Sequence, residues 1–201
     1  MDKLALLHAK AAAFTNIYDT DFAGRKRASA NYVTAMIQLE NSSPAEIAAI
    51  ISTFSDHLDL FLSVAEDPSE PSDVKIRALA YPIAEAFKDL TDSASRQQDM
   101  RTVSRLLQDD FLCGVTSIID FVNDKINIAP LMDRLIRIAE NRREEPYLRY
   151  EAMLTFDTLS KAARVFGQKI DHDRYNDRFT SVALNTVEPL ITKAALEFGV
   201  Q

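Results

Sequence analysis

Apolar side chains recur at the spacing of an α-helix along almost the whole chain, which has only four glycines among its 201 residues. Sheet proteins need many tight turns, and such turns draw heavily on glycine. Apolar residues three and four positions apart share one face of a helix, whereas a half-buried strand alternates. The sequence therefore predicts an all-α fold.

The clearest expected helix begins near Ser43. The segment Ser43-Pro44-Ala45-Glu46 has the form of a capping box, in which the serine oxygen and the glutamate side chain satisfy free backbone amides. Pro44 suits the first helical position. The apolar residues that follow fall on one helical face: Ile47, Ile50, Ile51, Phe54, Leu58 and Phe61. Pro68 and Pro71 should end this helix, because proline cannot continue it.

The rest of the chain shows the same spacing, so that roughly nine helices are expected in all. The other expected helices lie at 4–16, 26–40, 76–90, 100–107, 115–122, 131–139, 147–166 and 179–198. Pro82 should kink its helix near residues 78–81, and the polar residues 91–98 should contain a turn. Gly167 is expected to cap its helix in a left-handed conformation, and Pro189 to bend or split the last helix.

Composition and charge limit the class of protein. A chain of this length suits one all-helical domain over residues 1–201, with 66–73 as the place for a subdivision. The net charge of −7 disfavours a nucleic-acid binder and docking on anionic lipid. The single cysteine, Cys113, cannot form an internal disulfide, and no apolar run is long enough to span a membrane. We therefore expect a cytoplasmic protein without membrane contact.

One segment resembles a known helical repeat. Leu148-Arg149, Ala152, Thr155-Phe156 and Leu159 are similar to the second helix of a HEAT or armadillo repeat. Val74-Lys75 and Ala78 echo its beginning 74 residues earlier, and the echo fails at Pro82. Two repeats would fit that interval, with a middle copy near 111–122. The resemblance implies a short α-solenoid whose concave face binds another protein. The alternative is an irregular helical bundle.

Motifs for catalysis and cofactors are absent from the sequence, so no cofactor is expected. The most suggestive pair is His172-Asp173, which resembles the metal-binding pair of HD-type phosphohydrolases. That resemblance implies a metal held by His172, Asp173 and ligands from other helices. The alternative is a helix N-terminus, where Asp171 or Asp173 caps free amides.

Two sets of residues are candidates for binding. Arg25, Lys26 and Arg27 form the sharpest basic cluster, suited to phosphate or an acidic partner, although such runs are usually solvated. Tyr147, Arg149 and Tyr150 follow a loop, and tyrosine and arginine are enriched at interface hot spots. The alternative for this second set is ordinary packing at the start of a helix.

These observations favour a non-enzymatic, protein-binding helical domain that serves as an adaptor, regulator or assembly subunit. Its expected partner is another protein, and a homo-oligomer is an alternative. A small metal-dependent helical hydrolase is the second hypothesis. A nucleic-acid binder that uses residues 25–27 is the third, and the overall charge opposes it.

Overall fold

The computed structural model describes residues 44–106 and 118–199. Within these two ranges the chain is helical and contains no strand, which confirms the all-α prediction. The elements in chain order are α3 (Pro44–Glu66), α4 (Ser72–Leu79), the π-helix η1 (Ala80–Glu85), α5 (Ala86–Leu106), α6 (Ile118–Lys125), α7 (Ile128–Glu140), α8 (Pro146–Phe166), α9 (His172–Leu184) and α10 (Pro189–Gly199). The helices expected at 4–16 and 26–40 lie outside the described residues.

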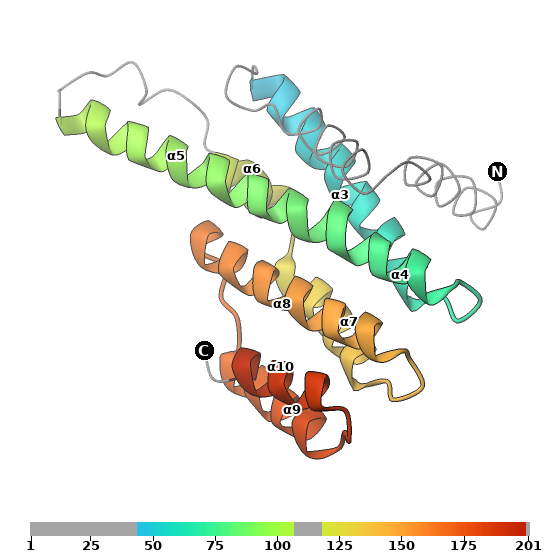
Figure 1. Ribbon diagram of the computed structural model, residues 1–201. Coiled ribbons are helices and arrows are strands. Elements are labelled where there is room, and N and C mark those ends of the chain that lie inside the picture. The colour runs from blue at the N-terminus through green and yellow to red at the C-terminus, as the bar shows by residue number, and fades with distance from the viewer. Residues whose placement is uncertain (1–43, 107–117, 200–201) are drawn as a thin grey trace, which may run out of the picture.

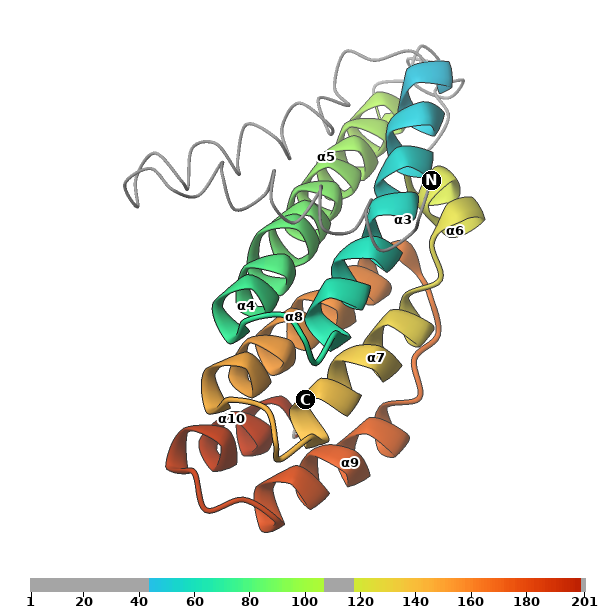
Figure 2. The same cartoon turned by 90° about the vertical axis from the view of Figure 1, so that its right-hand side faces the viewer.

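The helices form two layers built from three antiparallel pairs (Figures 1 and 2). One layer contains α3, α7 and α9, and the other contains the continuous helix α4-η1-α5 followed by α8 and α10. Each pair packs against the next, since α8 contacts α4 and α5 on one side and α10 on the other. The short helix α6 fills the corner between α3, α5 and α8. Residues 67–71 form the turn inside the first pair, within the range 66–73 considered for a subdivision, and α3 and α4 pack together on either side of it.

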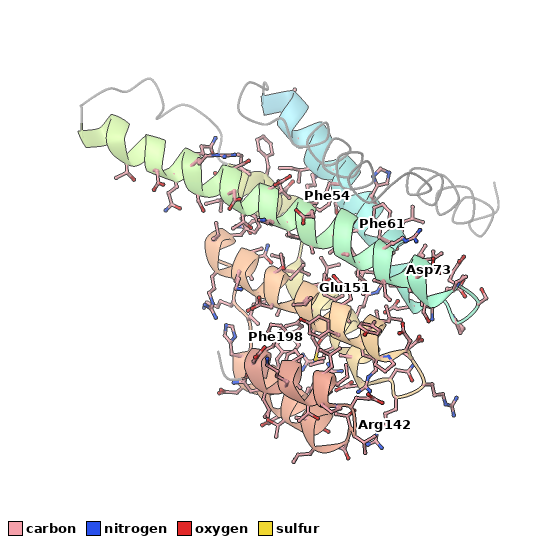
Figure 3. The ribbon with its side chains drawn as sticks, in the orientation of Figure 1. Phe54, Phe61, Asp73, Arg142, Glu151 and Phe198 are labelled. Atoms are coloured by element: carbon pink, nitrogen blue, oxygen red, sulfur yellow. The ribbon has the colours of Figure 1, made fainter. Side chains whose placement is uncertain are left out.

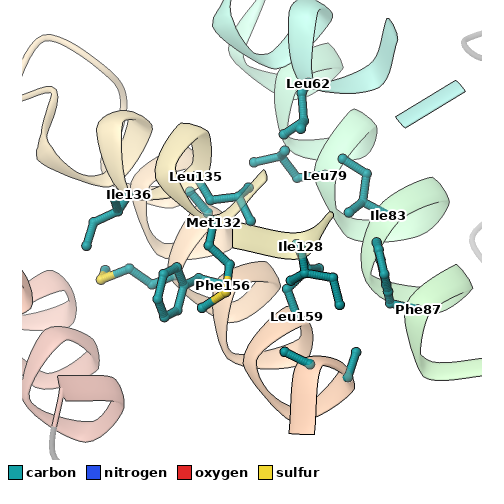
Figure 4. Packing of buried hydrophobic residues seen from close by; sticks show 14 of the residues in the cluster. Leu62, Leu79, Ile83, Phe87, Ile128, Met132, Leu135, Ile136, Phe156 and Leu159 are labelled. Atoms are coloured by element: carbon teal, nitrogen blue, oxygen red, sulfur yellow. The ribbon is translucent and has the colours of Figure 1, made fainter. Parts of the chain in front are cut away.

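One apolar core runs through all three pairs. Its largest fully buried side chains include Phe87, Phe166 and Phe179. Figure 4 shows the middle of this core, where Met132, Leu135 and Phe156 pack between the first and last pairs. Burial of such side chains is the main favourable term in folding, because it removes apolar surface from water.

The helix boundaries agree in most places with the sequence signals. Helix α3 begins at Pro44, and Gly167 caps α8 in the left-handed conformation with φ 70°. Pro189 does split the last expected helix, because it begins α10 after a turn that follows Leu184. Of the expected α3 face, Ile51, Phe54, Leu58 and Phe61 are buried.

The turn predicted at residues 91–98 is wrong. Helix α5 continues through this stretch to Leu106, with Leu90 and Ala94 buried four residues apart. The stretch is polar because most of its other side chains are exposed or only partly buried, and not because the chain reverses. The described ranges therefore hold seven helices if α4, η1 and α5 count as one. The helices expected at 76–90 and 100–107 are parts of this one helix, and the helix expected at 179–198 is divided between α9 and α10.

The disturbance expected at Pro82 takes the form of the π-helical segment η1. In a π-helix each backbone hydrogen bond spans five residues instead of four, and such segments are common sites of helix irregularity. Proline lacks the amide that a regular α-helix would use here. The expected kink at 78–81 thus lies slightly too early, because the irregular segment extends to Glu85.

The π-helical segment also explains why the echo of the α8 pattern stops at Pro82. Before it, Ala78 and Leu79 are buried like Ala152 and Met153, which lie 74 residues later. After it, the buried positions match at an interval of 73: Ile83 with Phe156, Ala86 with Leu159, and Leu90 with Ala163. One extra residue is therefore accommodated in η1. Because α8 packs directly on α4 and α5, the two similar segments lie on neighbouring helices. Most of the middle copy expected near 111–122 lies outside the described residues.

Candidate protein-binding surfaces

The structure separates the three residues predicted as a patch at the start of α8. Tyr147 is 64% exposed, Tyr150 is partly buried against the core, and Arg149 is only 4% exposed. The Arg149 Nε donates a hydrogen bond of 2.8 Å to the carbonyl of Ala139. Arg149 is therefore an internal connector between α8 and α7, and the part of the trio that a partner can reach is Tyr147.

The predicted metal pair lies at the N-terminus of α9. The Oδ1 of Asp171 accepts a hydrogen bond of 3.1 Å from the amide of Arg174, so Asp171 is the helix cap. His172 and Asp173 are exposed in the first turn. Within the described ranges, no three histidine, cysteine or acidic side chains are grouped so that they could hold a metal ion.

His172 also lines a small pocket between α8, α9 and α10. The carboxylate in that pocket, Asp157, lies 2.6 Å from the Lys161 Nζ in an ion pair on the same helix. Phe156, Phe179 and Phe198 form much of the remaining wall. The pocket thus adds aromatic surface around His172 and no further set of acidic ligands.

The basic cluster Arg25, Lys26 and Arg27 lies outside the described residues, so its role stays a prediction. The described helices show no segment long and apolar enough to cross a membrane.

A polar contact joins the first helix pair to the second beside the loop between α7 and α8. Lys75 on α4 is buried, and its Nζ lies 3.1 Å from Glu144 in the loop between α7 and α8. Arg149 occupies the corresponding place on α8. The pKa of Arg149 lies below its ordinary value, because burial and then the charge of Arg142 lower it. The charge of Glu188, in the loop between α9 and α10, offsets part of this shift. Lys75 thus joins the first pair to the loop of the second by an ion pair, whereas the printed contact of Arg149 joins α8 to α7 within the second pair.

A second set of contacts joins the helices of the other layer. Arg134 on α7 binds Asp59 and Glu66 on α3, with nitrogen–oxygen distances of 2.6 and 2.7 Å. Burial alone would lower the pKa of Arg134, but its hydrogen bonds and ion pairs with Glu66 and Asp59 raise it above the ordinary value. These charge-assisted bonds fix how α3 lies against α7.

Helix α9 binds α7 in the same way. Arg178 donates to Glu140 at 2.7 Å, and Arg174 lies 2.9 Å from Asp133. The Tyr175 hydroxyl donates to Asp133 at 3.1 Å, and burial, followed by the charge of Asp133, raises the pKa of this tyrosine to about 12. The hydrogen bond to Glu140 raises the pKa of Arg178.

Large apolar side chains are exposed along the edge formed by the loops inside the pairs. Figures 1 and 2 show that these loops lie along one edge of the molecule. Tyr147 at the start of α8, Val187 in the loop before α10 (95% exposed) and Leu190 at the start of α10 are the exposed large apolar residues in or next to two of these loops. Exposed apolar residues that gather at one place mark interaction sites more often than scattered ones do. We call Tyr147, Val187 and Leu190 the loop edge.

Two polar side chains on α8 lack the partners that buried groups usually have. Figure 3 labels Glu151 on α8, beside the helix formed by α4 and α5. Burial raises the pKa of its carboxyl group, and no ion pair involves it among the described residues. One turn later, the Oγ1 of Thr155 is fully buried without a hydrogen-bond partner in the described part of the chain.

No protein-family model, curated protein or solved structure matches this chain. The sequence analysis did not predict that acidic residues join the helix pairs. A signal for them exists: Asp59 and Glu66 recur as Asp133 and Glu140 at the same 74-residue interval as the HEAT-like echo. Two acidic residues seven positions apart are common on any surface helix, so only their contacts distinguish them.

Proposed function

We propose that this chain is a non-enzymatic, protein-binding domain, a short HEAT-like stack that acts as an adaptor, regulator or assembly subunit. The observation that carries the proposal is the loop edge, where Tyr147, Val187 and Leu190 expose apolar surface. Aromatic and aliphatic side chains that become buried on binding supply most of the energy of an interface. The partner is another protein, and the proposed location is the cytoplasm.

The arrangement of the pairs supports the stack. The three pairs follow one another in the same orientation, and the contacts between consecutive pairs use similar residue types at similar places. Stacks of this kind present extended surfaces on which side chains from several repeats meet one partner. In this chain the loop edge combines residues from the second and third pairs.

The test compares captured proteins between the full chain and loop-edge variants. The chain is immobilised and exposed to a lysate from its source, and bound proteins are identified by mass spectrometry. Tyr147→Ser with Val187→Ser should remove the specific partners while circular dichroism shows an unchanged helix content. Leu196→Ser on α10, which also removes an exposed apolar side chain, is the matched control.

The proposal fails if the loop-edge variant retains the same proteins as the unaltered chain. It also fails if the unaltered chain retains no protein above the level of an immobilised carrier.

A further inference from the structure

In the layer α3, α7, α9, the first two helices each carry an acidic face toward the helix that follows. On α3 this face contains Asp59, Ser63 and Glu66, spaced at i, i+4 and i+7. All three accept hydrogen bonds from Arg134 of α7, at 2.6, 3.2 and 2.7 Å. One arginine thus binds a stripe two helical turns long.

The stripe on α7 consists of Asp133 and Glu140, again seven residues apart. It binds two arginines of α9, since Arg174 donates to Asp133 at 2.9 Å and Arg178 donates to Glu140 at 2.7 Å. Twice in this molecule, therefore, an acidic stripe receives an arginine-bearing helix.

Helix α9 carries the same kind of stripe, and no helix of the described chain covers it. Asp173, Asp177 and Thr180 have the spacing i, i+4 and i+7, and Leu184 follows one turn later. Consecutive residues are about 100° apart around a helix, so this stripe lies beside the arginines that face α7. All four side chains are exposed, and neither aspartate has an ion pair or side-chain hydrogen bond within the described residues.

The stripe differs from an ordinary polar end of a helical stack. Terminal repeats need a polar outer face for solubility, and Asp173 and Asp177 alone would meet that need. Leu184, however, is 80% exposed at the end of the same stripe. An exposed leucine in line with two unpaired carboxylates matches a site for an amphipathic helix, with a cation for the acids and an apolar residue for the leucine.

We propose that the stripe Asp173, Asp177, Thr180 and Leu184 docks an arginine-bearing amphipathic helix of a partner protein, which extends the stack by one further helix. This proposal rests on the protein-binding function and names one partner surface for it.

A second copy of this chain fits the stripe less well than an arginine-bearing partner. Helix α3, the first described helix of a second copy, has Leu60 at the position that Arg134 takes in α7. Two α9 stripes facing each other would bring four carboxylates together with no basic residue on either stripe, and such like-charge contacts disfavour binding.

The probe is a phage-displayed library of amphipathic helices with randomised surface positions, selected against the full chain. Selected helices should carry arginine at positions three or four residues apart, beside an apolar residue. Their affinity, measured by fluorescence anisotropy with synthetic peptides, should fall at least about tenfold for Asp173→Asn with Asp177→Asn. It should also weaken as salt rises from roughly 0.05 to 0.5 M.

The matched control is Asp92→Asn with Asp99→Asn on α5, which removes the same charge from exposed positions and should leave affinity unchanged. Selected helices without basic residues, or equal binding by the α9 variant and the control, would overturn the proposal. So would light scattering that shows a dimer of the full chain lost in the α9 variant, because the occupant would then be a second copy.

The two proposals can fail separately. Loss of binding only in the loop-edge variant would overturn the docking stripe and leave the proposed function standing. The opposite outcome is that selected helices bind through the stripe while no loop-edge variant changes the proteins captured from the lysate. That result would support the docking stripe and overturn the role of the loop edge in binding.

Discussion

At the scale of single residues, α8 contains two polar groups that have no partner among the described residues. A buried hydroxyl without a hydrogen bond leaves its loss of water uncompensated, and a carboxylate in a poorly hydrated place favours its neutral form. Thr155 has such a hydroxyl, Glu151 has such a carboxylate, and the two residues lie one helical turn apart. Both positions therefore offer substitutions that should stabilise the protein.

Thr155→Val should raise the free energy of unfolding by about 1 kcal/mol, because valine has a similar shape without the unpaired hydroxyl. The expected rise in melting temperature is about 2–4 °C. Thr158→Val is the matched control on the same helix, since the Thr158 hydroxyl donates to the carbonyl of Leu154 at 3.2 Å. The control should be neutral or slightly destabilising. A less stable Thr155 variant would show that the hydroxyl has a partner.

Glu151→Gln should stabilise the protein at neutral pH and not at acid pH. Burial raises the pKa of Glu151 in the folded state above its ordinary value of 4.5, so the charged form opposes folding at neutral pH. This penalty is present above the folded pKa, and it vanishes below the unfolded pKa, where both states are protonated. Urea unfolding at several pH values measures the difference. Glu197→Gln, an exposed change on α10, should show little effect at either pH, and a gain for Glu151→Gln that persists at acid pH would contradict the prediction.

At the scale of elements, charge-assisted bonds determine how the helix pairs meet. Apolar burial brings helices together but does not choose one orientation, because it is non-directional. The fork of an arginine bonds to carboxylates in a defined geometry. Arg134 and Arg178 therefore act as orienting contacts between pairs, in addition to the apolar core beneath them.

Arg134→Met should lower the free energy of unfolding by about 1–3 kcal/mol, because it removes bonds to both Asp59 and Glu66 and leaves their charges together. The matched control is Arg137→Met, one turn away on α7, where the side chain is mostly exposed and its distance to Glu66 is 3.6 Å. Its effect should stay within about 0.5 kcal/mol. Equal effects in chemical unfolding would show that the Arg134 contacts add nothing to stability.

At the scale of the whole molecule, stability should be uneven along the series of three helix pairs. In an array of pairs each unit contacts only its neighbours, so a terminal pair loses the contacts on one side. Helix α8 lies between α5 and α10 and contains several fully buried residues, whereas α9 and α10 have one outer side without a neighbouring helix in the described chain. Local opening should therefore begin at the pair α9 and α10.

Hydrogen exchange measured by mass spectrometry should show slower exchange in the middle of α8 than in α10. A peptide around Ala152 to Leu159 should keep its protection longest, and one around Leu190 to Ala195 should lose it earlier. Binding of an arginine-bearing helix to α9 should reduce this difference. Equal protection of both helices in the free protein would show that the stack opens as one unit.

Within the described residues, the sequence alone determined that the chain is helical and where several of the helices begin or end. The period of apolar residues, the capping glycine Gly167 and the prolines Pro44 and Pro189 are local signals, and local signals survive without knowledge of packing. The prediction of a turn at residues 91–98 was wrong because a loop and an exposed helix can have the same polar composition. The π-helical segment shifts the match between the buried positions of α4-α5 and α8 from an interval of 74 to one of 73, and nothing in the residue pattern alone distinguishes it from a kink.

Tertiary structure alone decided which polar residues are buried, paired or free. Arg149 and Tyr147 are two positions apart in sequence, yet one bonds inside the core and the other is exposed. Likewise Asp133 and Asp177 are ordinary surface acids in sequence, and only the presence of a following helix gives one its arginine partner. Spacing along a helix fixes which face a residue shares, but the neighbour opposite that face comes from distant parts of the chain.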